Sequence, residues 1–364
     1  MNLELVIRNY LEIVLRMKNS FLLLLVLVFF GCSDRGEQVE YIGLDSFSDN
    51  RIEISGNVLN GDFVFSWPSE IIIVDSLLII HDFHMQNYGL HIFRRSDGTF
   101  IKSFGARGRG PGELLSISSL SVNDNGVLIA YDANSRRVMK YDLHKLLNNE
   151  TYYYEEFSIP ERLSYFVSNV FSCGDNYLMT SYYQHFRYGI YNKLKDSVFS
   201  IYAQFPSFTD DEEVNRAIVE YGVLEISPNK QYLLNATYVG ATIELFCLND
   251  CSLDLKKALH ISKPQYNEVE GASPKWVNPT EECIIGTEDA FITNDAVYTL
   301  FWGVPNNALE ISKPYIVQYD YDLSIKKIFE TREVVGAFAV EGDCMYAVAC
   351  DDDGEYKLYT YATE

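Results

Sequence analysis

The sequence predicts an all-β protein built from repeated units, and two observations support this class. The chain holds 27 Tyr and 22 Phe among 364 residues, and aromatic side chains favour pleated, half-buried strands. A theme of one short apolar strand, preceded by a turn group with Asp, Asn, Gly or Ser and followed by a second strand, occurs six times. We therefore expect six similar antiparallel sheets.

The apolar strands recur with a spacing that indicates a β-propeller. They start at residues 77, 127, 177, 232, 297 and 345, which gives steps of 50, 50, 55, 65 and 48 residues. Six four-stranded sheets of this period are typical of propeller blades. The last unit shows only three strands, so we expect a strand within residues 51–65 to supply the fourth and close the ring. The first strand candidates in that range are residues 51–54 and 62–65.

The connection between the first two units is rich in glycine. Residues 104–113 hold four glycines and one proline between two strand-like runs. A phosphate-binding loop would end in Gly-Lys-Ser/Thr and lead into a helix, and neither feature is present. We interpret the segment as a tight structural connector, in which glycines permit sharp turns.

This connector carries a resemblance to a known family. The pattern Gly105-x-x-Gly108-x-Gly110-Pro111-Gly112-Glu113, after an aromatic strand, resembles the link between blades in TolB-like six-bladed β-propeller lipoproteins of Gram-negative bacteria. NHL-type propellers have a similar link. The clear motif covers residues 92–121, and the resemblance implies a fold and an envelope location but no reaction. Arg107, Arg109 and Glu113 are the charged loop residues that we would inspect first at the channel.

The N-terminal segment predicts a lipid anchor. Residues 21–30 are ten consecutive apolar residues, which suits a signal-peptide core and is too short to span a bilayer. Gly31-Cys32-Ser33 follows and resembles a lipobox, in which Cys32 carries the lipid. We expect residues 1–31 to be a signal peptide, with translation starting at Met1 or at Met17. The alternative is an uncleaved signal anchor. Residues 32–50 would then form a tether, and residues 51–364 the six-bladed propeller.

The net charge of −22 limits the partners. An acidic protein repels nucleic acid and anionic lipid surfaces. We expect attachment to the membrane through Cys32, a protein or glycan ligand, a monomeric propeller, and no nucleic-acid partner. The location would be the cell envelope, as an outer-membrane lipoprotein on either the periplasmic or the surface face.

Two insertions interrupt the repeats. Residues 208–221 predict a short helix capped by Thr209, with acidic residues in its first turn. Residues 263–283 contain three prolines with Trp276 between them, and form the longest segment outside the repeat. Long loops on a rigid scaffold often carry binding residues. We therefore expect ligand specificity in these insertions, with Trp276 as a candidate contact.

The cysteines and histidines are the candidates for disulfide and metal chemistry. Cys247 and Cys251 flank a plausible turn and could form a disulfide, or the six cysteines after Cys32 could simply be buried. His81 and His84 point to opposite faces of a straight strand, so we predict no metal site there. We predict no cofactor, with a calcium ion in the channel as the alternative.

The favoured function is a binding or interaction module without a catalytic residue that can be named. No linear catalytic motif occurs. The alternative is a propeller enzyme, of the lyase, hydrolase or lactonase type, with a site at the mouth of the central channel. The side chains that line this channel would discriminate the two.

Overall fold

The protein is described from a computed structural model, which covers residues 39–48, 50–84, 87–123, 125–159, 167–183, 186–249, 252–272 and 274–364. Met17, Cys32 and the rest of residues 1–38 lie outside the described residues, so the signal peptide and the lipid attachment stay predictions. Residues Val39–Glu364 form one compact unit.

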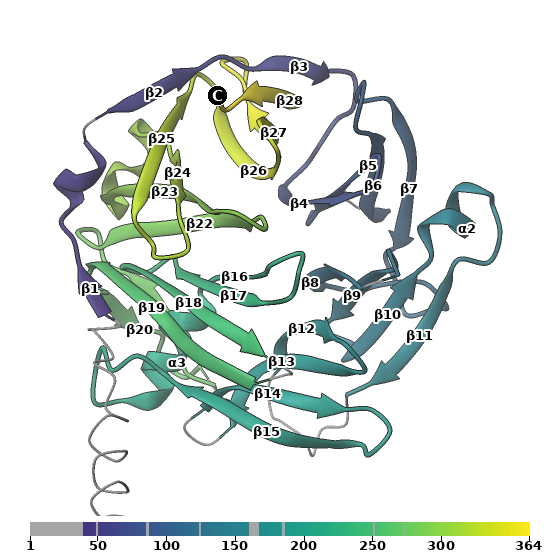
Figure 1. Ribbon diagram of the computed structural model, residues 1–364, viewed down its shortest axis with the longest axis horizontal. Coiled ribbons are helices and arrows are strands. Elements are labelled where there is room, and N and C mark those ends of the chain that lie inside the picture. The colour runs from purple at the N-terminus through teal and green to yellow at the C-terminus, as the bar shows by residue number, and fades with distance from the viewer. Residues whose placement is uncertain are drawn as a thin grey trace, which may run out of the picture. The chain divides into compact units, whose positions relative to one another are not determined.

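This unit is a ring of six antiparallel sheets, numbered here as blades 1 to 6 (Figure 1). The strands are β4 (Pro68–Val74), β5 (Leu77–Asp82), β6 (Tyr88–Arg94) and β7 (Phe100–Ala106) in blade 1; β8 (Ile117–Val122), β9 (Leu128–Asp132), β10 (Arg137–Tyr141) and β11 (Tyr153–Ser158) in blade 2; β12 (Val167–Cys173), β13 (Asn176–Tyr183), β14 (Phe186–Asn192) and β15 (Ser197–Gln204) in blade 3; β16 (Gly222–Ile226), β17 (Tyr232–Thr237), β18 (Ala241–Asn249) and β19 (Ser252–Ser262) in blade 4; β22 (Ile284–Ile292), β23 (Val297–Pro305), β24 (Tyr315–Tyr319) and β25 (Ile325–Thr331) in blade 5; and β26 (Val334–Glu341), β27 (Cys344–Cys350), β28 (Tyr356–Ala362) and β3 (Asn57–Asn60) in blade 6. The predicted six-bladed β-propeller is confirmed.

Each blade places its first strand nearest the ring centre. Figure 1 shows β4, β8, β12, β16, β22 and β26 around the middle. Several of these strands pack directly on their neighbours, as β8 does on β12, β16 on β22, and β26 on β4. Residues on the six first strands therefore meet at the centre although they lie far apart in the sequence.

The ring is closed by a strand from the N-terminal side. β3 pairs antiparallel with β28, with Val58 opposite Tyr359, and completes blade 6. Closure by an N-terminal strand is as predicted. The prediction of a strand at residues 62–65 is wrong, because Phe63 and Phe65 instead turn into an aromatic cluster, with their ring centroids 4.8 Å apart.

The propeller begins earlier than residue 51. β1 (Val39–Tyr41) pairs in parallel with β19, and β2 (Arg51–Ile54) pairs in parallel with β25. Between them the 3-10 helix η1 (Leu44–Phe47) buries Phe47 completely. The Phe47 ring lies 4.9 Å from that of Phe301. The predicted tether therefore overlaps the folded unit from Val39 onward.

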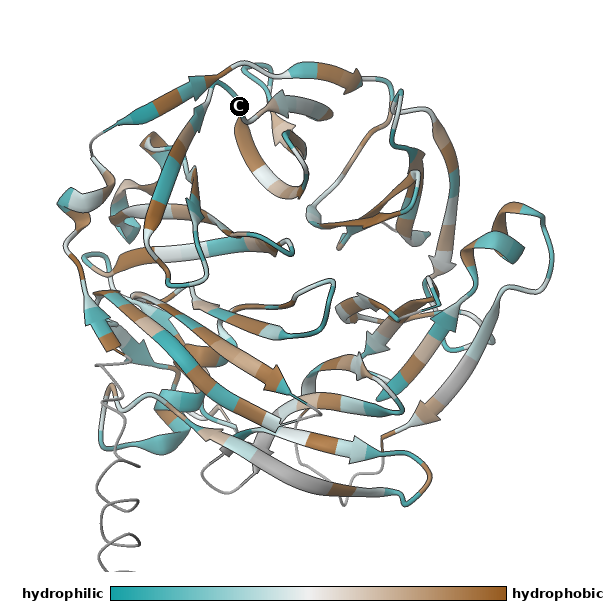
Figure 2. Cartoon of the chain, viewed as in Figure 1, coloured by the Kyte–Doolittle hydropathy of each residue, from teal (hydrophilic) through white to brown (hydrophobic). Residues whose placement is uncertain are grey.

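Apolar side chains fill the spaces within and between blades. Figure 2 shows apolar and polar residues alternating along many strands, as expected when one face is buried. One cluster joins blades 4 and 5, and its members include Leu234, Leu245, Val297 and Tyr319, each 0% exposed. Such inter-blade packing holds the first strands, and the residues on them, in place.

The two insertions pack against each other on blade 4. Helix α3 (Glu212–Glu220) shares an apolar cluster with Val277, which lies on the hairpin of β20 (Tyr266–Glu268) and β21 (Val277–Pro279). The predicted helix is present. Its cap is Asp211, whose side chain accepts hydrogen bonds from the N–H groups of Glu213 and Val214, and not Thr209 as predicted. Thr209 instead accepts a hydrogen bond from the Asp211 N–H.

The remaining short elements lie in connections. They are the helix α2 (Leu143–Leu147), which follows β10, and the 3-10 helix η3 (Asn306–Ile311), which follows β23. The acidic run at residues 351–354 forms the predicted hairpin loop between β27 and β28, where Asp351 accepts hydrogen bonds from the N–H groups of Asp353 and Glu355.

Candidate functional site

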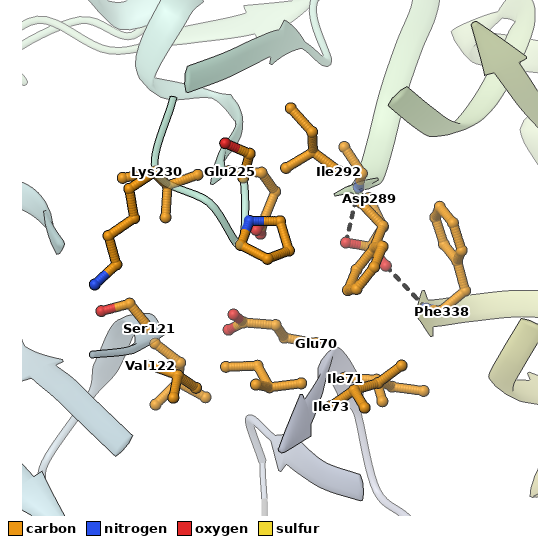
Figure 3. A pocket seen from close by; sticks show the side chains of 17 residues that line it. Glu70, Ile71, Ile73, Ser121, Val122, Glu225, Lys230, Asp289, Ile292 and Phe338 are labelled. Carbon is orange, nitrogen blue, oxygen red and sulfur yellow. Dashed lines mark hydrogen bonds between the residues drawn. The ribbon is translucent and has the colours of Figure 1, made fainter. Parts of the chain in front are cut away.

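The first strands of five blades surround a cavity of about 130 Å³ at the centre of the ring (Figure 3). Its polar residues include Glu70 on β4, Ser121 on β8, Glu225 on β16 and Asp289 on β22. We call these four residues together the channel site. The walls beside them are apolar and include Ile71, Ile73, Val122, Ile292 and Phe338. A second cavity of about 150 Å³ shares Glu70, Glu225 and Asp289. The three carboxyl groups therefore lie where the two cavities meet.

Asp289 is held rigidly between blades 5 and 6. Its side chain is 5% exposed and accepts hydrogen bonds from the N–H of Ala290 at 2.9 Å and from the N–H of Phe338 at 3.0 Å (Figure 3). Burial raises the pKa of Asp289 to about 8, although the two backbone hydrogen bonds act in the opposite direction. Both carboxylate oxygens thus already have a donor from the protein.

Glu70 and Glu225 differ from Asp289, because neither has a hydrogen-bond or ion-pair partner within the described parts of the chain. Both are half-buried. Burial, and then the charge of Asp289, raise the pKa of Glu70 to about 8. Burial, and then the charges of Glu70 and Asp289, raise the pKa of Glu225 well above its usual value. Both acids are harder to ionise than usual because they are buried close to another acid and receive no hydrogen bond or ion pair from the described residues.

Two further polar residues complete the cavity. Ser121 is 6% exposed, and its Oγ has no hydrogen-bond partner. Lys230, which follows β16, lines the cavity as well, and Figure 3 shows its amino group on the opposite side from Asp289. The site therefore combines acidic groups, one orphan hydroxyl and apolar walls.

A family model described as TolB-like 6-blade propeller-like matches residues 46–341. The chain belongs to this family. The resemblance of the glycine-rich connector to TolB-like propellers is thereby confirmed. A search of curated proteins found no match.

Solved structures share the fold of this TolB-like propeller at low sequence identity. One is a Bacteroides fragilis protein described as exported, with 14% identity, a TM-score of 0.59, and coverage of 89% of this chain and 98% of that protein. Another is a Bacteroides vulgatus member of the DUF4221 family, with 11% identity, a TM-score of 0.56, and coverage of 85% and 96%. At these identities the likeness concerns the fold alone.

The charged residues of the connector do not line the channel. The Glu113 Oε2 accepts a hydrogen bond from the Gly110 N–H at 2.7 Å, and the Glu113 carbonyl accepts one from Arg137 Nη2 at 2.8 Å. Arg107 and Arg109 are exposed. The reason is that the loop packs on the outer part of blade 2, where a Cβ on Gly112 would meet the Tyr153 ring at 2.7 Å. None of the three residues is among those that line the two central cavities, and the contacts of Glu113 are those of a structural loop.

Arg107 instead lines a separate cavity of about 220 Å³, together with His81 and His84. His81 Nδ1 lies 2.9 Å from Ser69 Oγ. Burial lowers the pKa of His81 to about 4, so the ring is neutral. No group of three or more His, Cys, Asp or Glu side chains among the described residues is arranged to hold a metal ion.

Trp276 has a packing contact in this propeller. Its half-buried ring meets the Tyr221 ring edge-on at a centroid distance of 5.2 Å, which joins the two insertions. A ligand contact at Trp276 stays a prediction. Cys247 is a free cysteine opposite Asp254, and Cys251 lies outside the described residues, so their disulfide also stays a prediction.

The channel acids were missed at the sequence level, although a signal exists. Glu70 precedes three isoleucines, Glu225 stands between Leu224 and Ile226, and Asp289 precedes Ala290 and Phe291. A single acid inside an apolar strand is unusual, because charged residues are seldom buried without a partner. Finding such acids on several first strands would have predicted an acidic channel.

Within the described residues, no helix is both long and apolar enough to cross a membrane.

Proposed function

We propose that this TolB-like propeller is a binding module of the cell envelope, anchored by a lipid on Cys32, that takes part of its ligand into the channel site. The observation that carries the proposal is the central cavity with Glu70 and Glu225 unpartnered on its wall. Polar groups shielded from water normally have partners, and leaving them without one is unfavourable. A ligand that supplies these partners would be bound in preference to water.

The envelope location is supported by the N-terminal segment and by a structural relative. Ten apolar residues precede Gly31 and Cys32, and the similar Bacteroides fragilis protein is described as exported. The negative net charge suits a protein or glycan ligand better than a nucleic acid. The propeller itself offers a rigid ring in which the channel residues are set before binding, which favours affinity.

An affinity experiment tests this function. Full-length wild-type protein is immobilised in detergent, and soluble and solubilised envelope extract is passed over it. The matched variants are E70Q/E225Q, which neutralises two channel acids, and E53Q/E150Q, which neutralises two exposed acids outside the channel and the insertions. We expect mass spectrometry to find components retained by the wild type and by E53Q/E150Q but lost with E70Q/E225Q. Equal retention by all three proteins would contradict a ligand site in the channel.

An enzyme of the lyase, hydrolase or lactonase type is the second candidate, and one observation favours it. Glu70 and Asp289, with a pKa of about 8 each, keep protons at neutral pH and could act as general acids. The same retained components decide between the two functions. A binding module returns them with unchanged mass after prolonged incubation at stoichiometric protein, whereas an enzyme converts them.

A further inference from the structure

We infer that the group bound in the channel site is an organic cation with N–H donors, such as an alkylammonium or a guanidinium. This inference rests on the proposed function, since it names the chemistry of the ligand that the channel takes. It would apply equally to a free amine and to a lysine or arginine side chain presented by a protein.

The charges at the channel site favour a cation. Glu70, Glu225 and Asp289 come from three blades and face one cavity, and Glu70 and Glu225 have no partner within the described chain. A positive group near them stabilises the ionised carboxylates, whereas a negative ligand would be repelled. Apolar walls, such as Ile73 and Phe338, would cover the carbon chain that carries the charge.

Ser121 gives a second, independent indication of a ligand. This side chain is 94% buried in the wall of the same cavity, and its Oγ has no hydrogen-bond partner. A buried hydroxyl without a partner is unusual in a native protein. An ammonium or guanidinium N–H could donate to it while other N–H groups donate to Glu70 or Glu225.

The arrangement suits an organic cation better than a metal ion. Both oxygens of Asp289 already accept backbone hydrogen bonds, so among the carboxyl groups of the channel site only Glu70 and Glu225 have no hydrogen-bond partner in the described chain. Calcium takes six to eight oxygen ligands at short distance. The described residues offer no group of three or more acidic, His or Cys side chains placed for such coordination. Separate N–H donors on a planar or tetrahedral cation can reach groups that are further apart.

Binding of a cation should release protons. The titratable groups that face the channel are Glu70 on β4, Glu225 on β16, Lys230 in the turn after β16, and Glu288 and Asp289 on β22. Burial raises the pKa of all four carboxyl groups, and that of Glu70 and Asp289 to about 8, so a carboxyl group that is protonated must lose its proton to pair with the ligand. Affinity should therefore rise as the pH increases toward 8, by up to about tenfold per pH unit for each proton released.

The test uses butylammonium chloride as the probe, with 1-butanol as the neutral match and calcium chloride as the metal probe. The full-length protein in detergent is titrated at pH 8.5 and pH 6, and apparent affinity is obtained from the rise in Tm with probe concentration. The proteins compared are the wild type, E70Q, E225Q, S121A and the surface control E53Q. Nα-acetyl-lysine methylamide presents the same cationic group on a peptide, so its affinity relative to butylammonium distinguishes a protein side chain from a free amine as the source.

We expect butylammonium to bind the wild type and E53Q at pH 8.5. The affinity of the wild type should be at least about tenfold lower at pH 6, and the affinities of E70Q and E225Q at pH 8.5 should be at least about tenfold lower than that of the wild type. S121A, which preserves the charges, should weaken binding several-fold. Equal binding of 1-butanol, or unchanged binding by E70Q and E225Q, would overturn the inference. Stabilisation by calcium alone would also overturn it, yet would leave the channel as a ligand site, so this failure is distinct from failure of the proposed function.

Discussion

Glu70, Glu225 and Asp289 show how single residues give the channel its chemistry. Each acid stands on the first strand of its blade and loses water as the ring closes around it. Desolvation disfavours the charged form, and the neighbouring acids add to the effect. The folded protein therefore binds protons at these positions more tightly than the unfolded chain does.

This proton binding predicts a pH dependence of stability. The pKa of Glu70 is raised from 4.5 to about 8, so between these values the native state holds a proton that the unfolded state has lost. The free energy of unfolding should fall as pH rises through this range, and stability should be greatest on the acidic side. Because Gln cannot ionise, the stability of E70Q should depend less on pH. The difference in free energy of unfolding between E70Q and the wild type should shift in favour of E70Q by about 1–2 kcal/mol from pH 5 to pH 8.5. Chemical denaturation at both pH values measures this, with E53Q as the control. If the free energy of unfolding of E70Q fell with pH as steeply as that of the wild type, the raised pKa of Glu70 would be refuted.

Arg187 and Glu244 give a second prediction for single residues. Arg187 Nη1 lies 2.6 Å from Glu244 Oε2, Nη2 lies 3.0 Å from Oε1, and both side chains are almost fully buried. Removing one charge leaves the other without compensation, so E244L should lower the free energy of unfolding by about 3–5 kcal/mol. The double variant R187M/E244L should recover much of that loss. A double variant as unstable as E244L would show that packing, and not the unpaired charge, dominates.

The channel acids could not be placed from the sequence for a simple reason. Glu70 and Asp289 are separated by more than half of the chain, and they approach each other only because six blades close into a ring. A polar residue within one strand does not reveal which other strands share its surroundings. The motif that contains Arg107, Arg109 and Glu113 is local and can be recognised in the sequence, but Glu113 makes the contacts of a loop on blade 2.

At the scale of elements, the sequence predicts best what is apolar and periodic. The second and third strands of all six blades lie where their apolar runs indicated, since each is buried between neighbouring strands. The sequence did not predict β1, and it could not predict that β1 pairs in parallel with β19 and β2 with β25. Both strands are short and mostly exposed, so burial leaves little pattern in their residues. Their partners, β19 and β25, lie more than 200 residues away in the sequence.

The segment of residues 39–48 provides a test of whether this element belongs to the folded propeller. Phe47 is 0% exposed and packs on Phe301 and Tyr315. If residues 39–48 belong to the propeller, F47A should lower the free energy of unfolding by about 3–5 kcal/mol, because it leaves a cavity. Y41A on the same segment is the matched control, since Tyr41 is 75% exposed, and should have a far smaller effect. Equal, small effects of both substitutions would indicate that the segment acts as a tether.

At the scale of the whole molecule, we propose separate roles for the closed ring and for the N-terminal segment. The ring fixes the channel, and β3 joins the beginning of the folded unit to its end through blade 6. Only six residues, 33–38, lie between Cys32 and β1. At about 3.5 Å per extended residue, a lipid at Cys32 would hold the propeller within about 30 Å of the membrane surface.

The anchor is tested by C32A. We expect the wild-type protein to sediment with membranes and to label with a radioactive fatty acid, and C32A to lose the label and remain in the soluble or unprocessed fraction. The C247A variant, which removes a cysteine within the propeller, serves as the control and should behave as the wild type. Labelling of C32A at the wild-type level would exclude this attachment site.

The central claim, that the channel site binds a cationic group, is tested most directly by a crystal structure of the full-length protein with butylammonium at pH 8.5. The account predicts density for the amine between Glu70 and Glu225, with a nitrogen within hydrogen-bond distance of Ser121 Oγ or of a carboxylate. The same experiment with E70Q should show a weaker or vacant site. An empty wild-type channel under saturating probe, or an amine bound only on the outer surface of the blades, would contradict the claim.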